Sequence, residues 1–225
     1  MAELIDKALL VRRIPYSDTS LICHFFTEQH GRITLMARGA RRPKSSFRAS
    51  LEPLFDLKIS WRPGRTGMGT LTDVQRGASL LQPAQVLDGQ ELLAIASRLF
   101  QEGDPHGFSE LAASLHMLES SKQTQGLSVA VWHLLDQAGL LGDLQHCWHC
   151  SAEVPGTMFW QQGHLLCGDC GTGMEISAGL RKSITTVLNG GRIMLSGQYS
   201  RTWREIIRMV LNEQGIKATD SFKTV

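Results

Sequence analysis

The sequence predicts an α+β protein, in which a small N-terminal β-barrel is followed by an α-helical domain that carries a four-cysteine zinc element. Three observations predict this architecture. Apolar and polar residues alternate through roughly the first 75 residues, as they do in half-buried strands. After Gly77 the apolar residues recur at helical spacing. Four of the five cysteines form two C-x-x-C pairs between residues 147 and 170.

The first 79 residues are expected to form the barrel. A proline ends the first alternating run, and glycine-containing turns at residues 29–31 and 62–69 separate later ones. Five short strands without a helical period are typical of the OB-fold, a five-stranded Greek-key barrel. The expected strands are residues 7–15, 20–28, 32–39, 55–61 and 70–75.

Residues 80–225 are expected to form the helical domain. Leu93, Ala96 and Phe100 illustrate the helical spacing that begins here. The cysteine segment, about residues 144–173, interrupts the helical pattern and is interpreted as an insertion. The expected helices are residues 84–101, 108–121, 127–138, 177–188 and 202–214.

Charge is unevenly distributed along a chain whose net charge is only +2. Residues 1–76 hold thirteen Lys and Arg against seven Asp and Glu, whereas residues 77–146 hold two against eight. A basic barrel beside acidic helices indicates two modules with different partners. The N-terminus lacks the pattern of a signal peptide and no apolar run is long enough for a membrane span, so we expect a cytoplasmic protein.

The cysteines Cys147, Cys150, Cys167 and Cys170 follow the spacing C-x2-C-x16-C-x2-C, which is typical of a four-thiolate zinc site. Two such pairs complete a tetrahedron and leave no open position for water or substrate, so the predicted zinc is structural. Redox and iron–sulfur chemistry stay open as alternatives. Three histidines in the same segment can replace a thiolate: His146, His149 and His164.

A basic segment from Arg38 to Arg48 is the predicted DNA-binding site, because guanidinium groups and hydroxyls suit phosphate oxygens. Pro43 and paired serines favour a loop over a helix. The alternative is a solvated surface loop. The predicted DNA-binding residues are Arg38, Arg41, Arg42, Lys44 and Arg48, together with Arg62 and Arg65 in the next strand connection. Three aromatic residues are either base-stacking platforms or core: Tyr16, Phe47 and Trp61.

Catalytic motifs are otherwise missing from the sequence. The stretch GRTGMG has the spacing of neither a phosphate-binding loop nor a dinucleotide fingerprint, and no nucleophile motif accompanies the scattered histidines. We therefore expect a protein that is not an enzyme.

Several motifs in order resemble those of the bacterial RecO family of recombination mediators and DNA repair proteins. They are the turn TEQHGR, the loop ARGARRPKS, the tripeptide LEP and the cysteine segments LLGDLQHCWHCSAE and LLCGDC. The resemblance covers nearly the whole chain. It implies an OB-fold, a helical domain and a zinc-binding element, in agreement with the pattern of the residues.

The resemblance also implies partners that the spacing of residues does not reveal. Family members bind single- and double-stranded DNA, anneal complementary strands and contact the C-terminal tail of the single-stranded DNA-binding protein. With RecR they help to load the RecA recombinase onto coated strands, in the cytoplasm and near the nucleoid.

The acidic tail requires a basic rim around an apolar groove. Candidates for this rim are Arg181, Lys182, Arg201, Arg204 and Arg208. A different class of function stays open beside this one, namely a zinc-containing protein-interaction scaffold whose DNA binding is incidental.

Overall fold

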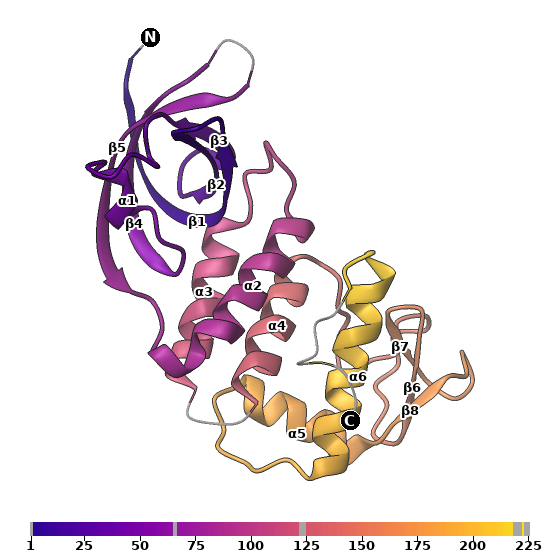
Figure 1. The fold of residues 1–225 in the computed structure, drawn as a ribbon. Helices are drawn as coiled ribbons and strands as arrows, with labels where there is room; N and C mark the ends of the chain where they lie inside the picture. The colour runs from indigo at the N-terminus through magenta and orange to yellow at the C-terminus, as the bar shows by residue number, and fades with distance from the viewer. Residues whose placement is uncertain (1, 65–66, 122–124, 218–221, 223–225) are drawn as a thin grey trace. The chain divides into compact units, whose positions relative to one another are not determined.

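The computed structural model describes residues 2–64, 67–121, 125–217 and 222 (Figure 1). By their internal contacts the residues form two compact units, 1–121 and 122–225. The sequence predicts a boundary at residue 79 between the barrel and the helical domain. The two compact units divide the chain by internal contacts instead, so this boundary stays a prediction. Among the described residues, no helix has the length and apolar character needed to cross a membrane.

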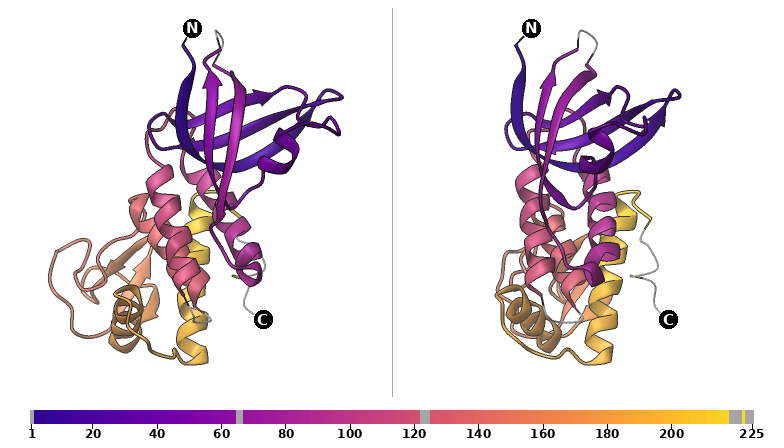
Figure 2. Two further views of the ribbon diagram at one scale, coloured as in Figure 1. Left: turned by 90° about the vertical axis from the view of Figure 1, so that its left-hand side faces the viewer. Right: turned by 60° about the vertical axis from the view of Figure 1, so that its left-hand side comes forward.

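The first unit begins with a closed five-stranded barrel of strand order β1-β2-β3-β5-β4, in which β4 pairs back onto β1. The pairing of β3 with β5 is parallel, and the other four pairings are antiparallel. Figure 2 shows the strands curving around one another from two further sides. The predicted OB-type barrel is therefore confirmed. Its strands are β1 (Leu4–Tyr16), β2 (Ser20–Thr27), β3 (Gly31–Ala37), β4 (Phe55–Arg62) and β5 (Gly69–Ser79).

Residues that alternate between apolar and polar in the sequence point alternately into and out of this barrel. On β4, Leu57 and Ile59 are buried, whereas Asp56 and Lys58, which alternate with them along the strand, are exposed. Apolar side chains from all five strands fill the interior, so the barrel is a packed core. Core residues with almost no exposed surface include Leu10, Phe25, Leu35 and Ile59.

Two helices complete the first unit: α2 (Val86–Leu99), which follows the 3₁₀ turn η1 (Pro83–Gln85), and α3 (Phe108–Ser120). The TEQHGR turn between β2 and β3 forms hydrogen bonds with the end of α2 and with the loop that precedes α3. Arg32 donates from Nη1 to the carbonyl oxygens of Ser97 and Phe100, over 2.7 and 2.6 Å. Gly31 has φ +64°, and a Cβ there would lie 2.1 Å from the carbonyl oxygen of Asp104. Glycine followed by arginine is thus required by packing at this turn.

The second unit contains three helices and a small sheet: α4 (Gly126–Gln137), α5 (Ala178–Leu188), α6 (Gly197–Glu213), and the strands β6 (Met158–Gln161), β7 (His164–Leu166) and β8 (Met174–Ile176). Trp132 of α4 and Trp203 of α6 meet edge to face, with ring centroids 6.0 Å apart, in the core between these helices. The sheet has the order β7-β6-β8 and follows the first cysteine pair.

The structure extends β1 and β5 beyond their predicted bounds and differs from the prediction in three further elements. Helix α6 begins five residues earlier than predicted, because the Ser196 side chain accepts a hydrogen bond from the backbone N–H of Tyr199 and caps the helix there. Within the cysteine segment, where the sequence predicts a short hairpin, β8 adds a third strand to the sheet. The basic segment, predicted as a loop throughout, ends in one helical turn, α1 (Phe47–Ser50).

Candidate nucleic-acid interface and metal centre

The basic segment between β3 and β4 is anchored to the barrel by apolar residues that reach into the barrel core. Ala40 and Leu51 are buried in the barrel core, and Phe47 packs against the same cluster. Between these anchors, successive backbone hydrogen bonds close turns from Arg42 to Gly39 and from Ser45 to Arg42, over 3.0 and 3.1 Å. The loop therefore has a defined shape with an apolar side and a polar side.

The cations of this basic loop (residues 38–48) lie on its polar side. Five of the seven predicted DNA-binding residues are here and all five are exposed: Arg38, Arg41, Arg42, Lys44 and Arg48. Within the described part of the chain, none of these five forms an ion pair. Uncompensated cations on an ordered loop leave their N–H groups free for anionic oxygens.

Arg41 fixes the basic loop to the turn between β1 and β2. Its backbone N–H donates to the carbonyl oxygen of Thr19 over 2.8 Å, and its Nη1 donates to that of Ser17 over 2.9 Å. This turn is one of the loops with which OB-folds bind oligonucleotides. Tyr16, at the end of β1, is 49% exposed and lies at the same turn. The structure thus brings an exposed aromatic ring to the basic loop.

Trp61 and Phe47, the other two candidate stacking residues, are not platforms. Trp61 is only 8% exposed and belongs to the barrel core, where its ring meets His30 edge to face at 5.5 Å between centroids. Phe47 packs partly buried against the core. The core alternative is therefore the correct one for both.

Arg62 lies at the same end of the barrel as the basic loop. Met36 near the end of β3 pairs with Thr70 of β5, and Thr70 pairs with Arg62 of β4, so two strand spacings separate Arg62 from β3. Its charge is partly compensated, because Nε lies 3.9 Å from Glu3 Oε1. The other predicted residue of this strand connection, Arg65, lies outside the described residues.

One exposed cation on β1 was missed in the sequence. A β-bulge between Leu10 and Arg12 shifts the register of β1, so that Arg12 pairs with His24. His24 in turn pairs with Thr34, and His24 Nδ1 lies 3.0 Å from Thr34 Oγ1. Burial and the charge of Arg32 lower the pKa of His24, which keeps this ring neutral. The strand 2–3 face, where OB-folds bind nucleic acid, thus carries Arg12 at its side.

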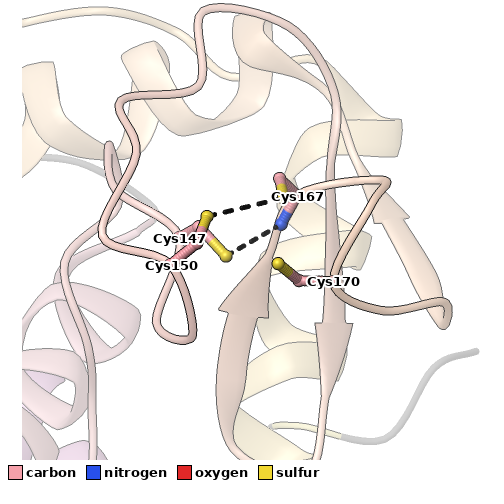
Figure 3. A group of neighbouring side chains, drawn as sticks. All are labelled: Cys147, Cys150, Cys167 and Cys170. Atoms are coloured by element: carbon pink, nitrogen blue, oxygen red, sulfur yellow. Dashed lines mark hydrogen bonds between the residues drawn. The ribbon is translucent and has the colours of Figure 1, made fainter.

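The four cysteines of the second unit converge on one point (Figure 3). Their four sulfur atoms all lie within 4.8 Å of one another, and Cys150 Sγ lies 3.9 Å from Cys167 Sγ. Each pair sits in a tight turn closed in the same way. The N–H of Ser151 donates to the Cys147 carbonyl over 2.8 Å, and that of Gly171 to the Cys167 carbonyl over 3.2 Å.

This geometry fits a tetrahedral metal ion. With metal–sulfur bonds of about 2.3 Å, a tetrahedron has sulfur–sulfur distances of about 3.8 Å. The donor set is four thiols, and all five cysteines of the chain are free of disulfides. The backbone N–H of Cys167 donates to Cys147 Sγ over 3.3 Å, a contact typical of the outer environment that orients metal thiolates. The four cysteines are therefore close enough together to hold a metal ion.

The thiol pKa values show why a cation belongs in this cluster. Backbone N–H groups of Cys150 and Cys167 directed at its sulfur lower the pKa of Cys147 to about 6. The hydrogen bond to Cys167 raises the pKa of Cys170 to about 12. One cysteine therefore loses its proton easily, and its negative charge opposes the deprotonation of a second cysteine. A divalent cation compensates this repulsion and keeps the sulfurs deprotonated.

Arg181 of α5 is a buried residue that stabilises the cysteine segment through hydrogen bonds. It is 5% exposed, and its guanidinium donates to the carbonyl oxygens of Leu144, Val154 and Gly156. Burial lowers the pKa of Arg181 against the attraction of Asp143. Its proposed place on an exposed basic rim was therefore wrong: this arginine ties both flanks of the first cysteine pair to α5.

Comparison with known proteins covers both units. Residues 1–80 match the family profile described as Recombination protein O N terminal, and residues 89–214 match that of Recombination protein O C terminal. The second match alone covers more than half of the chain. The chain belongs to the RecO family.

Several curated relatives carry the name DNA repair protein RecO. The RecO protein of Proteus mirabilis is 32% identical over 163 residues, which are 69% of this chain and 65% of the relative. That of Idiomarina loihiensis is 32% identical over 67% of this chain and 65% of the relative. A RecO protein of Actinobacillus pleuropneumoniae is 46% identical over 87 residues, 39% of this chain. The chain spans only 35% of the Actinobacillus protein and less than two thirds of the other two.

Proposed function

We propose that this protein is a DNA-binding recombination mediator in DNA repair, and that the basic loop of its barrel is the DNA-binding site. The observation that carries the proposal is the ordered loop of unpaired cations at one end of a closed OB-type barrel. Membership of the RecO family and the names of its relatives support the DNA repair role.

The proposed contacts follow from the position of each side chain. Arg38, Arg42, Lys44 and Arg48 neutralise phosphates along one strand, while Arg41 orients the loop and Tyr16 stacks on a base at the neighbouring turn. Arg12 and Arg62 extend the basic path to either side. Such contacts are independent of base sequence, so the protein binds single- and double-stranded DNA alike.

Strand annealing, cooperation with RecR and the loading of RecA are proposed from the family. An annealing mediator needs to hold one strand by its backbone and leave base edges free to pair. Phosphate-directed cations on a convex loop suit that role better than a closed groove does. The proposal includes no covalent chemistry.

We propose that the metal is zinc and that its role is structural. Four thiolates are soft ligands that favour zinc, and a site with four protein ligands has no position open for substrate. The segment is a loop and a small sheet whose strands have only three or four residues each, so metal binding supplies much of its folding energy. The iron–sulfur alternative predicts visible absorbance, and the zinc proposal predicts none.

For the tail of the single-stranded DNA-binding protein we propose the groove at the start of α5. Its volume is about 310 Å³, and its walls are apolar at Leu144, Val154, Pro155 and Ala178. Lys182 and the buried Arg181 also line this groove and supply cations for an acidic segment, and Glu153 is the one carboxylate among the lining residues. Arg208 is less suitable, because its guanidinium already pairs with Glu205.

An annealing assay tests the proposed function. Complementary strands coated with single-stranded DNA-binding protein are mixed with wild type or with the triple variant Arg38→Ala, Arg42→Ala, Lys44→Ala. The proposal predicts fast annealing by the wild type and a large loss in the triple variant. Equal annealing rates would contradict the assignment of the basic loop, and no annealing by either protein would favour the interaction-scaffold alternative.

A further inference from the structure

Trp148 is the exception among the tryptophans of this protein. The other four are between 1% and 8% exposed, whereas Trp148 is 60% exposed. Its position is the second in the first C-x-x-C pair, between two of the four clustered cysteines. An exposed indole at an ordered site is a candidate anchor for a partner, because tryptophan is enriched among the residues that dominate the energetics of protein interfaces.

The indole of Trp148 is held in one orientation. Its ring stacks on the imidazole of His164 with 4.0 Å between centroids and 1° between planes. Its backbone N–H donates to the carbonyl oxygen of Leu165 over 2.9 Å. Since His164 covers one face of the ring, the 60% exposure must come from the opposite face and the edges. The result is a rigid aromatic face directed at solvent.

The surroundings of this face are acidic. None of residues 123–180 is a lysine or an arginine. The same stretch carries exposed carboxylates at Asp143, Glu153 and Asp169. Asp143 and Trp148 both line a cleft of about 280 Å³, together with Gly142, His146 and Leu165. The first cation after this stretch, Arg181, is buried and directed at backbone carbonyls, and the next, Lys182, lines the groove along α5 with Glu153.

We propose that Trp148 and the carboxylates of Asp143 and Glu153 form a docking surface for a protein segment that presents arginine or lysine. A guanidinium placed over the free indole face is attracted by the ring quadrupole, and the neighbouring carboxylates pair with further cations of the same segment. Nucleic acid does not fit this surface. No lysine or arginine lines the cleft that holds the indole, so phosphates there would face the Asp143 carboxylate without a cation to neutralise them. The surface is independent of the basic loop of the barrel.

A binding measurement with a defined probe tests this proposal. Fluorescently labelled hexa-arginine peptide is titrated with the full chain, and binding is followed by fluorescence anisotropy at low and at physiological salt. Substituting Trp148→Leu keeps an apolar side chain and removes the ring, and we expect it to weaken binding about 2- to 5-fold. The double variant Asp143→Asn, Glu153→Gln should weaken binding about 2- to 10-fold and reduce its salt dependence.

Matched control variants distinguish binding at this surface from a general attraction of the peptide to acidic residues of the chain. Glu119→Gln and Asp136→Asn remove a half-buried carboxylate of α3 and an exposed one of α4 and should leave the affinity unchanged. Metal content and circular dichroism establish that each variant is folded. Equal affinities of wild type and the Trp148 variant, or an equal loss with the control carboxylates, would overturn the proposal. So would weaker binding of a labelled oligothymidine by the Trp148 variant, because that result would assign the indole face to nucleic acid.

Discussion

The guanidinium of Arg41 donates to the carbonyl oxygen of Ser17 over 2.9 Å and thereby joins the basic loop to the turn between β1 and β2. The two segments are more than twenty residues apart in sequence, yet together they present the exposed cations and Tyr16 at one end of the barrel. Arg41 therefore differs in role from its neighbour Arg42, whose side chain lies over Gly39 and bonds to no described residue.

This difference predicts unequal effects of two neighbouring substitutions. Arg42→Ala removes one phosphate contact, so the slope of log affinity against log salt should fall by about 0.7 to 0.9. Arg41→Ala also releases the loop from the β1–β2 turn, and the affinity should fall further than one contact explains. Fluorescence anisotropy with a labelled single strand at several salt concentrations checks both values. Identical losses for the two variants would show that the hydrogen bond to Ser17 does not order the loop.

Metal removal should affect the two units differently. A strong chelator at mildly acidic pH should release one zinc per chain, because protons compete with the metal for the thiolates. The loop and hairpin around the cysteines should then unfold, with loss of near-ultraviolet signal from Trp148 and Trp160. DNA binding by the barrel should persist, since no metal ligand lies in the first unit.

A single ligand substitution gives the same result without chelator. Cys150→Ser should lower metal affinity strongly, while Cys23→Ser serves as the matched control that changes a cysteine outside the cluster. Elemental analysis after gel filtration measures the metal. Full zinc content in the Cys150 variant would contradict the four-thiolate site.

Arg181 is predicted to be required for the stability of the cysteine segment. Arg181→Ala leaves three carbonyl oxygens without their donor, and the cost should be about 3 kcal/mol. Lysine cannot replace it, because one ammonium group does not reach three carbonyls as a planar guanidinium does. Lys182→Ala, next in the chain, should cost less than about 0.5 kcal/mol. Urea unfolding followed by tryptophan fluorescence compares the three variants, and equal stabilities would refute this role.

Cys23 predicts a specific pH dependence of stability. Burial raises the pKa of this thiol from 9.0 to about 12, against a smaller lowering by Arg13. Above pH 9 the unfolded chain loses this proton and the folded chain keeps it, so the unfolded state binds fewer protons. The free energy of unfolding should therefore decrease as pH rises from 9 towards 12. The difference between wild type and Cys23→Ala isolates this contribution from the other titrating groups. A pH-independent difference would contradict it.

Patterns of local spacing were sufficient to predict most of this fold. Strand alternation and helical periodicity depend on which face each residue buries, and the bounds of β2, β4 and α5 agree with the prediction within one residue. The start of α6 was missed because Ser196 caps a polar first turn that carries no apolar period. Capping by one serine is a weaker signal than periodicity.

The candidate site was harder to predict, because tertiary contacts decide the orientation of each side chain. Trp61 lies in an alternating strand, but only closure of the barrel makes its face the interior. The bulge at Val11 exposes both Arg12 and Arg13, and simple alternation would bury one of them. Arg181 resembles any helix-surface arginine in sequence. Its burial results from carbonyls more than twenty residues upstream.

The central claim is that the basic loop of the barrel binds the phosphates of DNA. The most direct test is the salt dependence of single-strand binding by wild type and by the variant Arg38→Ala, Arg42→Ala, Lys44→Ala, without any partner protein. Three lost contacts should reduce the slope of log affinity against log salt by about 2 to 3 and weaken binding to every base sequence alike. An unchanged slope and affinity would show that the loop is a solvated surface and that DNA binds elsewhere.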